Sequence, residues 1–111
     1  MLEECRGRWR VILHSDVAEF FERKELKREL EEWRRSLEES LNKDPAEIMR
    51  LLREPVLYNV GGVKRRRYRL YLRGEPYRLV YVVNARRCLV VFLLAAKRDE
   101  ETYMKLKRRK R

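Results

Sequence analysis

Hydrophobic residues recur at two different spacings along the chain. Between residues 26 and 41, four leucines and one tryptophan recur every three or four positions among charged residues, which predicts an amphipathic helix. Before it, residues 9–14 are largely apolar and predict a short strand that ends at the turn formers Ser15 and Asp16. Asp16, followed three residues later by Glu19, resembles a capping box. It predicts a short helix whose apolar face carries Val17, Phe20 and Phe21.

A third, shorter helix is predicted by the segment that begins at Asp44. Asp44 is a typical N-cap residue, Pro45 suits the first helical position, and Glu47 follows three residues after the cap. The helix should end before Pro55, because proline cannot continue it. Residues 56–63, which include two adjacent glycines, are predicted to form either a loop or a weak strand. The residues of this helix that should face inward are Ile48, Leu51 and Leu52.

The hydrophobic spacing then changes to two, which is typical of strands. Residues 67–73 alternate, and turns at 74–76 and 84–87 should connect them to strands at 77–83 and 88–96. A three-stranded antiparallel meander results, and the first strand can complete a mixed sheet covered by helices. We therefore expect one α+β domain over residues 1–111. In the alternating strand, one face should carry Tyr68, Leu70 and Leu72, and the other Arg67, Arg69, Tyr71 and Arg73.

Positive charge is concentrated in the second half of the chain. Residues 1–60 contain 12 Lys and Arg against 14 Asp and Glu, a net charge of −2, whereas residues 61–111 contain 17 against 4, a net charge of +13. Such a field suits a polyanion, because each neutralised phosphate releases condensed counterions. Nucleic acid is the favoured partner, ahead of an anionic membrane surface or a generally basic surface without a partner. The basic tail at 105–111 is either an RNA-binding arm or a solvated charge run.

The sequence lacks the residues that several enzyme classes require. There is no glycine-rich phosphate loop and no His-based triad, and His14, Cys5 and Cys88 do not make a metal-ligand set, so we expect no metal and no cofactor. The two cysteines are also too far apart in sequence to suggest a disulfide framework, and Cys88 is predicted to be a buried structural thiol. Without a secretion signal or a membrane span, the expected location is the cytoplasm. Absent glutamine and abundant Arg and Glu favour a thermophilic source.

The arginine-rich strand face has the composition that metal-free RNA cleavage requires. In that reaction the ribose 2′-OH attacks the neighbouring phosphate, cations stabilise the phosphorane-like transition state, and side chains transfer the protons. Arginine binds phosphate in a bidentate way, and aromatic rings can stack on bases. The same residues could instead be ordinary solvated positions of a strand.

The run from Tyr68 to Tyr81, followed by an apolar strand and then residues 97–103, resembles the second half of RelE-type toxins. These toxins are the messenger-RNA interferases of type II toxin–antitoxin modules and relatives of the ParE gyrase toxins. The resemblance implies a RelE-like fold and an endoribonuclease that cuts ribosome-bound mRNA, leaving 2′,3′-cyclic phosphate and 5′-OH ends. It also implies a RelB-like acidic antitoxin as partner, in a possible heterotetramer. We expect no membrane partner.

The resemblance also implies roles for individual residues. Arg69 and Tyr71 match positions that contact the scissile phosphate and activate the 2′-OH; Arg78 matches the arginine that stabilises the transition state. Arg98 matches a second phosphate-binding arginine, and Tyr103 a tyrosine for base stacking and proton transfer. The further residues expected to bind RNA are Arg67, Arg73 and Lys97.

Two other functions remain open at this stage. One is a RelE- or ParE-like protein that binds ribosomal RNA or inhibits gyrase without cutting; Tyr71, standing where a basic residue is usual, favours it, and Arg73 is the candidate substitute. The other is a structural subunit whose basic sheet binds an acidic antitoxin.

Overall fold

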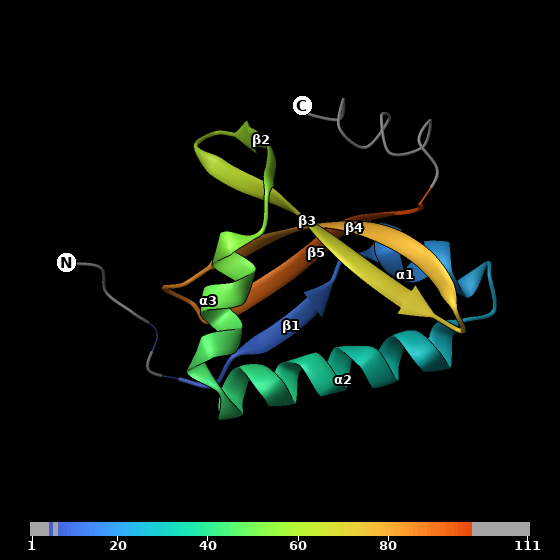
Figure 1. Cartoon of the computed structure of the whole chain (residues 1–111), viewed down its shortest axis with the longest axis horizontal. Helices are drawn as coiled ribbons and strands as arrows, with labels where there is room; N and C mark the ends of the chain where they lie inside the picture. The colour runs from blue at the N-terminus through green and yellow to red at the C-terminus, as the bar shows by residue number, and fades with distance from the viewer. Residues whose placement is uncertain (1–4, 6, 99–111) are drawn as a thin grey trace.

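The chain folds as an α+β domain in which three helices and a mixed sheet are formed by the residues that the structure describes. The structure, a computed structural model, describes Cys5 and residues 7–98. Its elements are, in order, β1 (Arg10–Leu13), α1 (Ser15–Glu22), α2 (Lys27–Lys43), α3 (Pro45–Arg53), β2 (Val56–Val60), β3 (Val63–Leu72), β4 (Glu75–Asn84) and β5 (Leu89–Lys97) (Figure 1).

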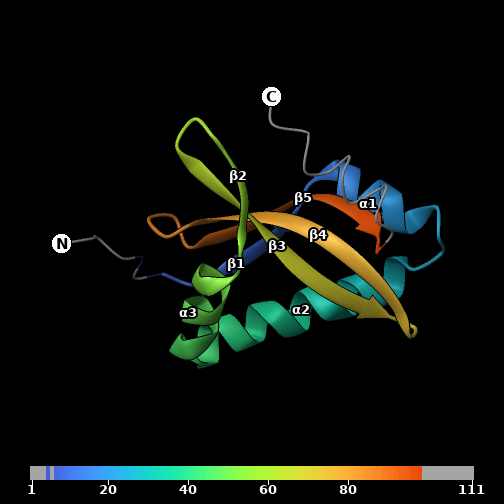
Figure 2. The same ribbon diagram turned by 45° about the horizontal axis from the view of Figure 1, so that its top comes forward.

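The strands form one sheet in the order β1-β5-β4-β3-β2. β1 runs parallel to β5 and the other neighbours are antiparallel, which confirms the predicted mixed sheet with a meander. Residues 56–63, which were predicted to be either a loop or a weak strand, form β2 and its turn into β3. The sheet therefore has one strand more than the meander and the first strand alone would give. Gly61 and Gly62, at φ 57° and 82°, supply the left-handed backbone of its turn. The hairpin projects away from α2 (Figure 2).

All three helices contribute to one core on one face of the sheet. Val17 and Phe21 of α1, the leucines of α2 and Leu51 of α3 pack with the buried residues of β3, β4 and β5. Leu52 is 38% exposed, so its predicted inward position is wrong. Ile48 and Leu51 lie three residues apart on one side of α3, and Leu52 falls on its outer flank. The strand residues of this core are Leu70, Leu72, Tyr77, Leu79, Tyr81, Val90 and Phe92.

The predicted cap of α3 is confirmed and that of α1 is wrong. The carboxylate of Asp44 accepts a hydrogen bond from the backbone N–H of Ala46, at 3.0 Å. In α1 the cap is His14, whose Nδ1 accepts from the N–H of Asp16 at 3.0 Å. The strand before it ends at Leu13, so the chain enters the helix earlier than the capping box implied, and Asp16 already lies in the first turn.

A buried hydrogen bond fixes the end of α3 to the sheet. The Tyr81 hydroxyl donates to the backbone carbonyl of Leu51 at 2.6 Å. In a continuing helix that carbonyl would accept from residue 55, but Pro55 has no N–H. Tyr81 therefore supplies the missing donor, and its burial raises the pKa of its phenol. This contact holds α3 against β4.

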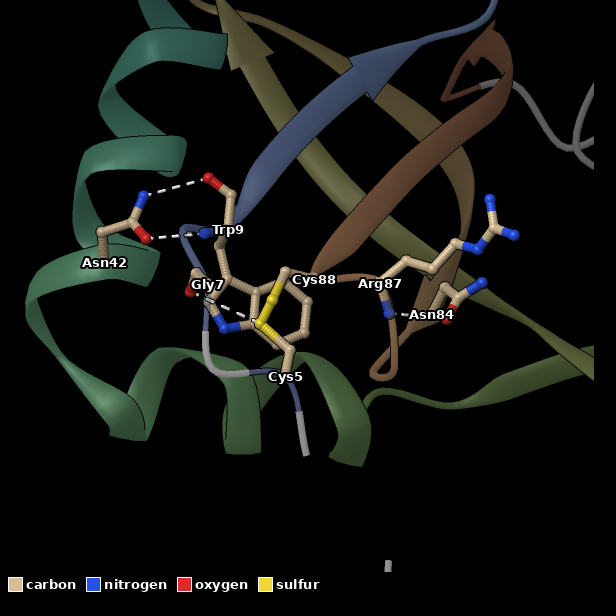
Figure 3. Close-up of a disulfide and its surroundings, with 7 residues drawn as sticks. All are labelled: Cys5, Gly7, Trp9, Asn42, Asn84, Arg87 and Cys88. Carbon is tan, nitrogen blue, oxygen red and sulfur yellow. Dashed lines mark hydrogen bonds between the residues drawn. A yellow bond between two sulfur atoms is a disulfide. The ribbon is translucent and has the colours of Figure 1, made fainter. Parts of the chain in front are cut away.

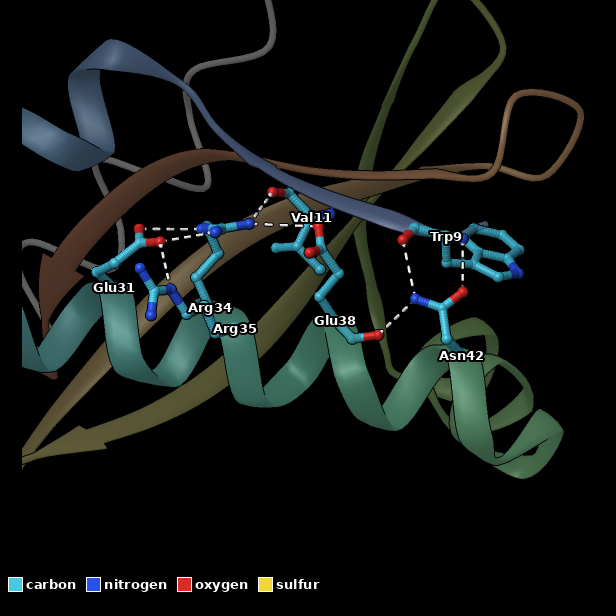
Figure 4. Close-up of polar contacts among 7 residues, drawn as sticks. All are labelled: Trp9, Val11, Glu31, Arg34, Arg35, Glu38 and Asn42. Atoms are coloured by element: carbon cyan, nitrogen blue, oxygen red, sulfur yellow. Dashed lines mark hydrogen bonds and ion pairs between the residues drawn. The ribbon is translucent and has the colours of Figure 1, made fainter. Parts of the chain in front are cut away.

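The free edge of β1 is covered by polar side chains of α2. The Asn42 amide pairs with both backbone groups of Trp9: its Oδ1 accepts from the N–H at 2.7 Å and its Nδ2 donates to the carbonyl at 3.0 Å. Glu38 accepts from the N–H of Val11 at 2.9 Å, and Arg34 donates to the carbonyl of Val11 at 3.2 Å (Figure 4). These contacts occupy backbone groups that would otherwise be open to another strand.

Replacing Asn42 with alanine is expected to lower the free energy of unfolding by about 1–3 kcal/mol, because the Trp9 N–H and carbonyl lose their partner. Chemical denaturation would measure the loss. Glu39→Ala, an exposed substitution on the same helix, should change stability by less than about 0.5 kcal/mol. Equal stability of the Asn42 variant and the parent would contradict this role.

The two cysteines form a disulfide, so the prediction of a free thiol at Cys88 is wrong, although its burial is confirmed at 5% exposure. The residues are 83 positions apart, yet their Cα atoms lie 5.3 Å apart, within the range that a disulfide spans. Parallel pairing of β1 with β5 brings the N-terminal segment beside the turn between β4 and β5 (Figure 3). There the N–H of Cys5 donates to the carbonyl of Ala85 at 3.0 Å.

Candidate functional site

The face of the sheet turned away from the core carries a pair of directly opposed arginines. The inward packing of Tyr68, Leu70 and Leu72 confirms the predicted alternation of β3 and puts Arg69 on the other face. Arg69 lies directly opposite Arg78 of β4, whose neighbour on β5 is Ala96. Like charges directly opposite one another on a sheet are unfavourable, and an anion bound between them relieves that repulsion.

The next row of the same face adds an aromatic ring and a third arginine. Tyr71 lies opposite Pro76, and its side chain is 58% exposed. The backbone N–H of Arg98, just beyond the end of β5, donates to the Pro76 carbonyl at 3.1 Å. Four of the residues predicted to be catalytic therefore come from neighbouring positions on β3, on β4 and just beyond the end of β5. We call Arg69, Tyr71, Arg78 and Arg98 the arginine cluster.

Two predicted RNA-binding residues lie apart from this cluster. Arg73 follows the end of β3 with a left-handed φ of 51°, which breaks the alternation. Its side chain turns to the helical side of the sheet and forms an ion pair with Glu29 of α2 at 2.6 Å, so its expected place beside Tyr71 is wrong. Lys97 lies opposite the buried Tyr77 and so on the helical side as well. Tyr103 and the tail at 105–111 lie outside the described residues.

The floor of this sheet face is apolar. Val80 and Ala96 are buried there, and Leu57 and Leu94 pack against them. The pairing of β4 with β5 contains a bulge between Val80 and Tyr81. Because of this extra residue, Leu94 lies opposite Val80 on this face while Phe92, two residues earlier, lies in the core on the other face. This face thus combines an apolar floor with arginines, a combination suited to ligands with both apolar rings and negative charge.

Two cavities lined by described residues border this face, and the sequence analysis predicted neither. The first has a volume of about 260 Å³ and lies at the edge of β3 next to α3; we call it the edge pocket. The second, of about 190 Å³, lies between the β2–β3 hairpin and the start of α1. The edge pocket is lined by Arg50, Glu54, Arg67, Tyr68 and Arg69. The second is lined by His14, Asp16, Tyr58, Val60, Arg65, Leu93 and Leu94.

The edge pocket contains a guanidinium that the sequence did not single out. Arg50 donates to the Glu47 carboxylate at 2.8 Å. This hydrogen bond is the main reason why the pKa of Arg50 is raised, and the nearby Tyr68 adds to it. Arg50 and Tyr68 both line the pocket, so α3 and β3 meet there. Only the tertiary arrangement of α3 could reveal that Arg50 lies near Arg67 and Arg69.

Neither a metal site nor a membrane span is found in the described part of the chain. No three His, Cys, Asp or Glu residues among those described gather closely enough to hold a metal ion. No described helix is long and apolar enough to cross a membrane. No protein-family model matches the chain, and neither a curated protein nor a solved structure is significantly similar to it. The resemblance of the 68–81 and 97–103 segments to RelE-type toxins therefore stays a prediction.

Proposed function

We propose that the protein is a RelE-like toxin, a metal-free endoribonuclease that cuts messenger RNA on the ribosome. The observation that carries this proposal is the direct opposition of Arg69 and Arg78 on the sheet face turned away from the core, with Arg98 and Tyr71 in the next row. Guanidinium groups bind phosphate oxygens through paired N–H donors and keep their charge at any physiological pH. This arrangement suits a phosphate that gains negative charge during reaction.

In the proposed reaction the ribose 2′-oxygen attacks the adjacent phosphorus while the bond from phosphorus to the 5′-oxygen breaks. The proton of the 2′-OH passes to a base and another proton reaches the leaving 5′-oxygen, which leaves a 2′,3′-cyclic phosphate and a 5′-OH. Arg69, Arg78 and Arg98 stabilise the charge on the phosphorane oxygens. Tyr71 stacks on a neighbouring base or takes part in proton transfer, a role that the resemblance also gives to Tyr103.

The proposal places the chain in the cytoplasm, where ribosomes are, with a RelB-like acidic antitoxin as its partner. The Cys5–Cys88 disulfide is unusual for that compartment in most organisms, but intracellular proteins of hyperthermophiles often contain disulfides. The absence of glutamine and the abundance of arginine and glutamate agree with such a source. The disulfide and the amino-acid composition are therefore both consistent with an intracellular protein from a thermophilic source.

A non-cleaving RNA-binding or gyrase-inhibiting protein is the second candidate. The observation that favours it is the composition of the arginine cluster, which contains three guanidinium groups and one phenol but neither a carboxylate nor an imidazole. Such a set binds phosphate well, whereas proton transfer rests on the tyrosine hydroxyls.

The two candidates are separated by incubating the purified chain with ribosomes stalled on a defined message. We expect cuts whose 3′ ends resist phosphatase until acid opens the cyclic phosphate, and whose 5′ ends accept phosphate from a kinase. A message with a 2′-deoxy residue at the mapped site should stay intact, because its nucleophile is missing. An intact normal message, together with inhibited supercoiling by gyrase or salt-sensitive ribosome binding, would reject cleavage in favour of the second candidate.

A further inference from the structure

The edge pocket lies beside the arginine cluster and shares a residue with it. Arg69 belongs to the cluster through its position opposite Arg78, and it also lines the edge pocket. Arg67 lies two residues before it on the same face of β3, about 7 Å away at the usual rise of a strand. Neighbouring phosphates of an extended single strand are separated by a similar length. A strand that places one phosphate at the cluster can therefore place the next one at the pocket.

The charges of the edge pocket favour an anion. Its lining contains the three guanidinium groups of Arg50, Arg67 and Arg69 against the single carboxylate of Glu54. Among the described residues, the Nε of Arg67 is buried without a hydrogen-bond partner, as is the Nε of Arg65 beside the second cavity. A buried donor left without a partner is costly. A small movement of the Arg67 guanidinium toward a ligand oxygen in the edge pocket would remove that cost.

The groups that line the pocket are also held in place before any ligand binds. Glu47 fixes Arg50 from one side at 2.8 Å, and the Tyr68 hydroxyl accepts from the indole N–H of Trp33 at 3.3 Å. The end of α3 is held by the Tyr81 hydroxyl, which donates to Leu51 at 2.6 Å. Donors fixed in this way lose little conformational entropy on binding. A volume of about 260 Å³ accommodates a phosphate group with part of a sugar.

We propose that the edge pocket binds the phosphodiester next to the scissile one in a single RNA strand, with Arg50, Arg67 and Arg69 as its ligands. The inference rests on the proposed function in taking the arginine cluster as the site of the scissile phosphate. It assigns a substrate-binding role to α3 through Arg50. The two non-bridging oxygens of a phosphodiester can accept from guanidinium groups that converge from α3 and β3. An RNA strand is favoured over an acidic peptide because the pocket adjoins the arginine cluster at about the spacing of neighbouring phosphates.

The test uses a trinucleotide of RNA whose riboses are all 2′-O-methylated, so that it binds but cannot be cut. Its affinity at low salt is compared with that of trinucleotides in which either phosphodiester is replaced by a neutral methylphosphonate. The parent chain should bind the doubly charged form about tenfold more tightly than either singly charged form. In Arg50→Ala that difference should disappear, because the second phosphate has lost a main ligand.

Arg53→Ala is the matched control, since Arg53 is exposed on the same helix, does not line the pocket and carries the same charge. It should keep the tenfold difference. Arg50→Lys retains the charge but loses the paired N–H donors of the guanidinium, so its affinity difference between the doubly and singly charged trinucleotides should be smaller than tenfold. This variant replaces Arg50→Ala in the test if Arg50→Ala melts at a lower temperature than the parent. A difference that persists unchanged in both Arg50 variants would overturn the inference.

Two further arms separate the possible ligands. Inorganic phosphate that shifts the Arg67 Nε–H resonance, without any gain from the second phosphodiester, would assign the pocket to a small phosphate and reject the RNA site. Tighter binding of a triglutamate peptide than of the trinucleotide would reject it in favour of an acidic protein. If the parent cuts message but binds the doubly and singly charged trinucleotides equally well, only this inference fails. If the second phosphodiester raises the affinity in an Arg50-dependent way but message stays intact, the cleavage proposal fails and the phosphodiester site stands.

Discussion

Replacing Arg69 and Arg78 together with alanine is expected to lower the rate of message cleavage by at least about a hundredfold. These residues face one another across β3 and β4. In the proposed reaction both guanidinium groups act where charge develops on the phosphorane. Removal of one preorganised donor to a transition-state anion typically costs a factor of about 10² to 10³. Single-turnover cleavage of ribosome-bound message measures the effect separately from product release.

The matched control is the double substitution of Arg86 and Arg87 with alanine. Both lie exposed in the turn between β4 and β5, at the end of these strands remote from the arginine cluster, and their removal changes the net charge equally. Loss of non-specific electrostatic attraction should affect both double variants, whereas the large loss of rate should be confined to the first. Similar rates for the two variants would show that the opposed arginines have no catalytic role.

Stability gives an independent check on the same variant. The Arg69/Arg78 double variant should remain folded at the temperature of the cleavage assay, because neither side chain belongs to the hydrophobic core. A variant that is folded but inactive therefore separates a functional role from a structural one.

Local patterns in the sequence predicted the parts of the site that depend on one strand. Alternation in β3 correctly put Arg67, Arg69 and Tyr71 on the face opposite the core, because the pleat repeats every two residues. The same rule failed at Arg73, where a left-handed φ of 51° follows the last strand residue. The rule holds only while the backbone stays extended.

Features that depend on distant segments could not be predicted in this way. The edge pocket requires Arg50 of α3 to meet β3, and that meeting depends on the Tyr81 hydroxyl replacing the N–H that Pro55 lacks. The disulfide requires the parallel pairing of β1 with β5. Neither the spacing nor the type of these residues shows which distant segments pair. The large sequence separation of the two cysteines therefore did not reveal whether they form a disulfide.

Reduction of the Cys5–Cys88 disulfide is expected to lower the free energy of unfolding by about 4–5 kcal/mol. The bond joins residues 83 positions apart, and the chain-entropy relation for so long a loop gives a value of this order. For a domain of this size the melting temperature should fall by on the order of 20 °C. Thermal unfolding with and without a reductant measures the shift.

The Cys5→Ala and Cys88→Ala double variant should melt near the reduced parent and should not respond to reductant. Its folded form should still bind the trinucleotide normally at low temperature, because the disulfide precedes β5 whereas Arg98 follows it, which places the bond and the arginine cluster at opposite ends of that strand. The disulfide therefore acts on the population of folded chains and not on the site itself. Unchanged melting of the parent in reductant, with both thiols then open to alkylation, would contradict that role.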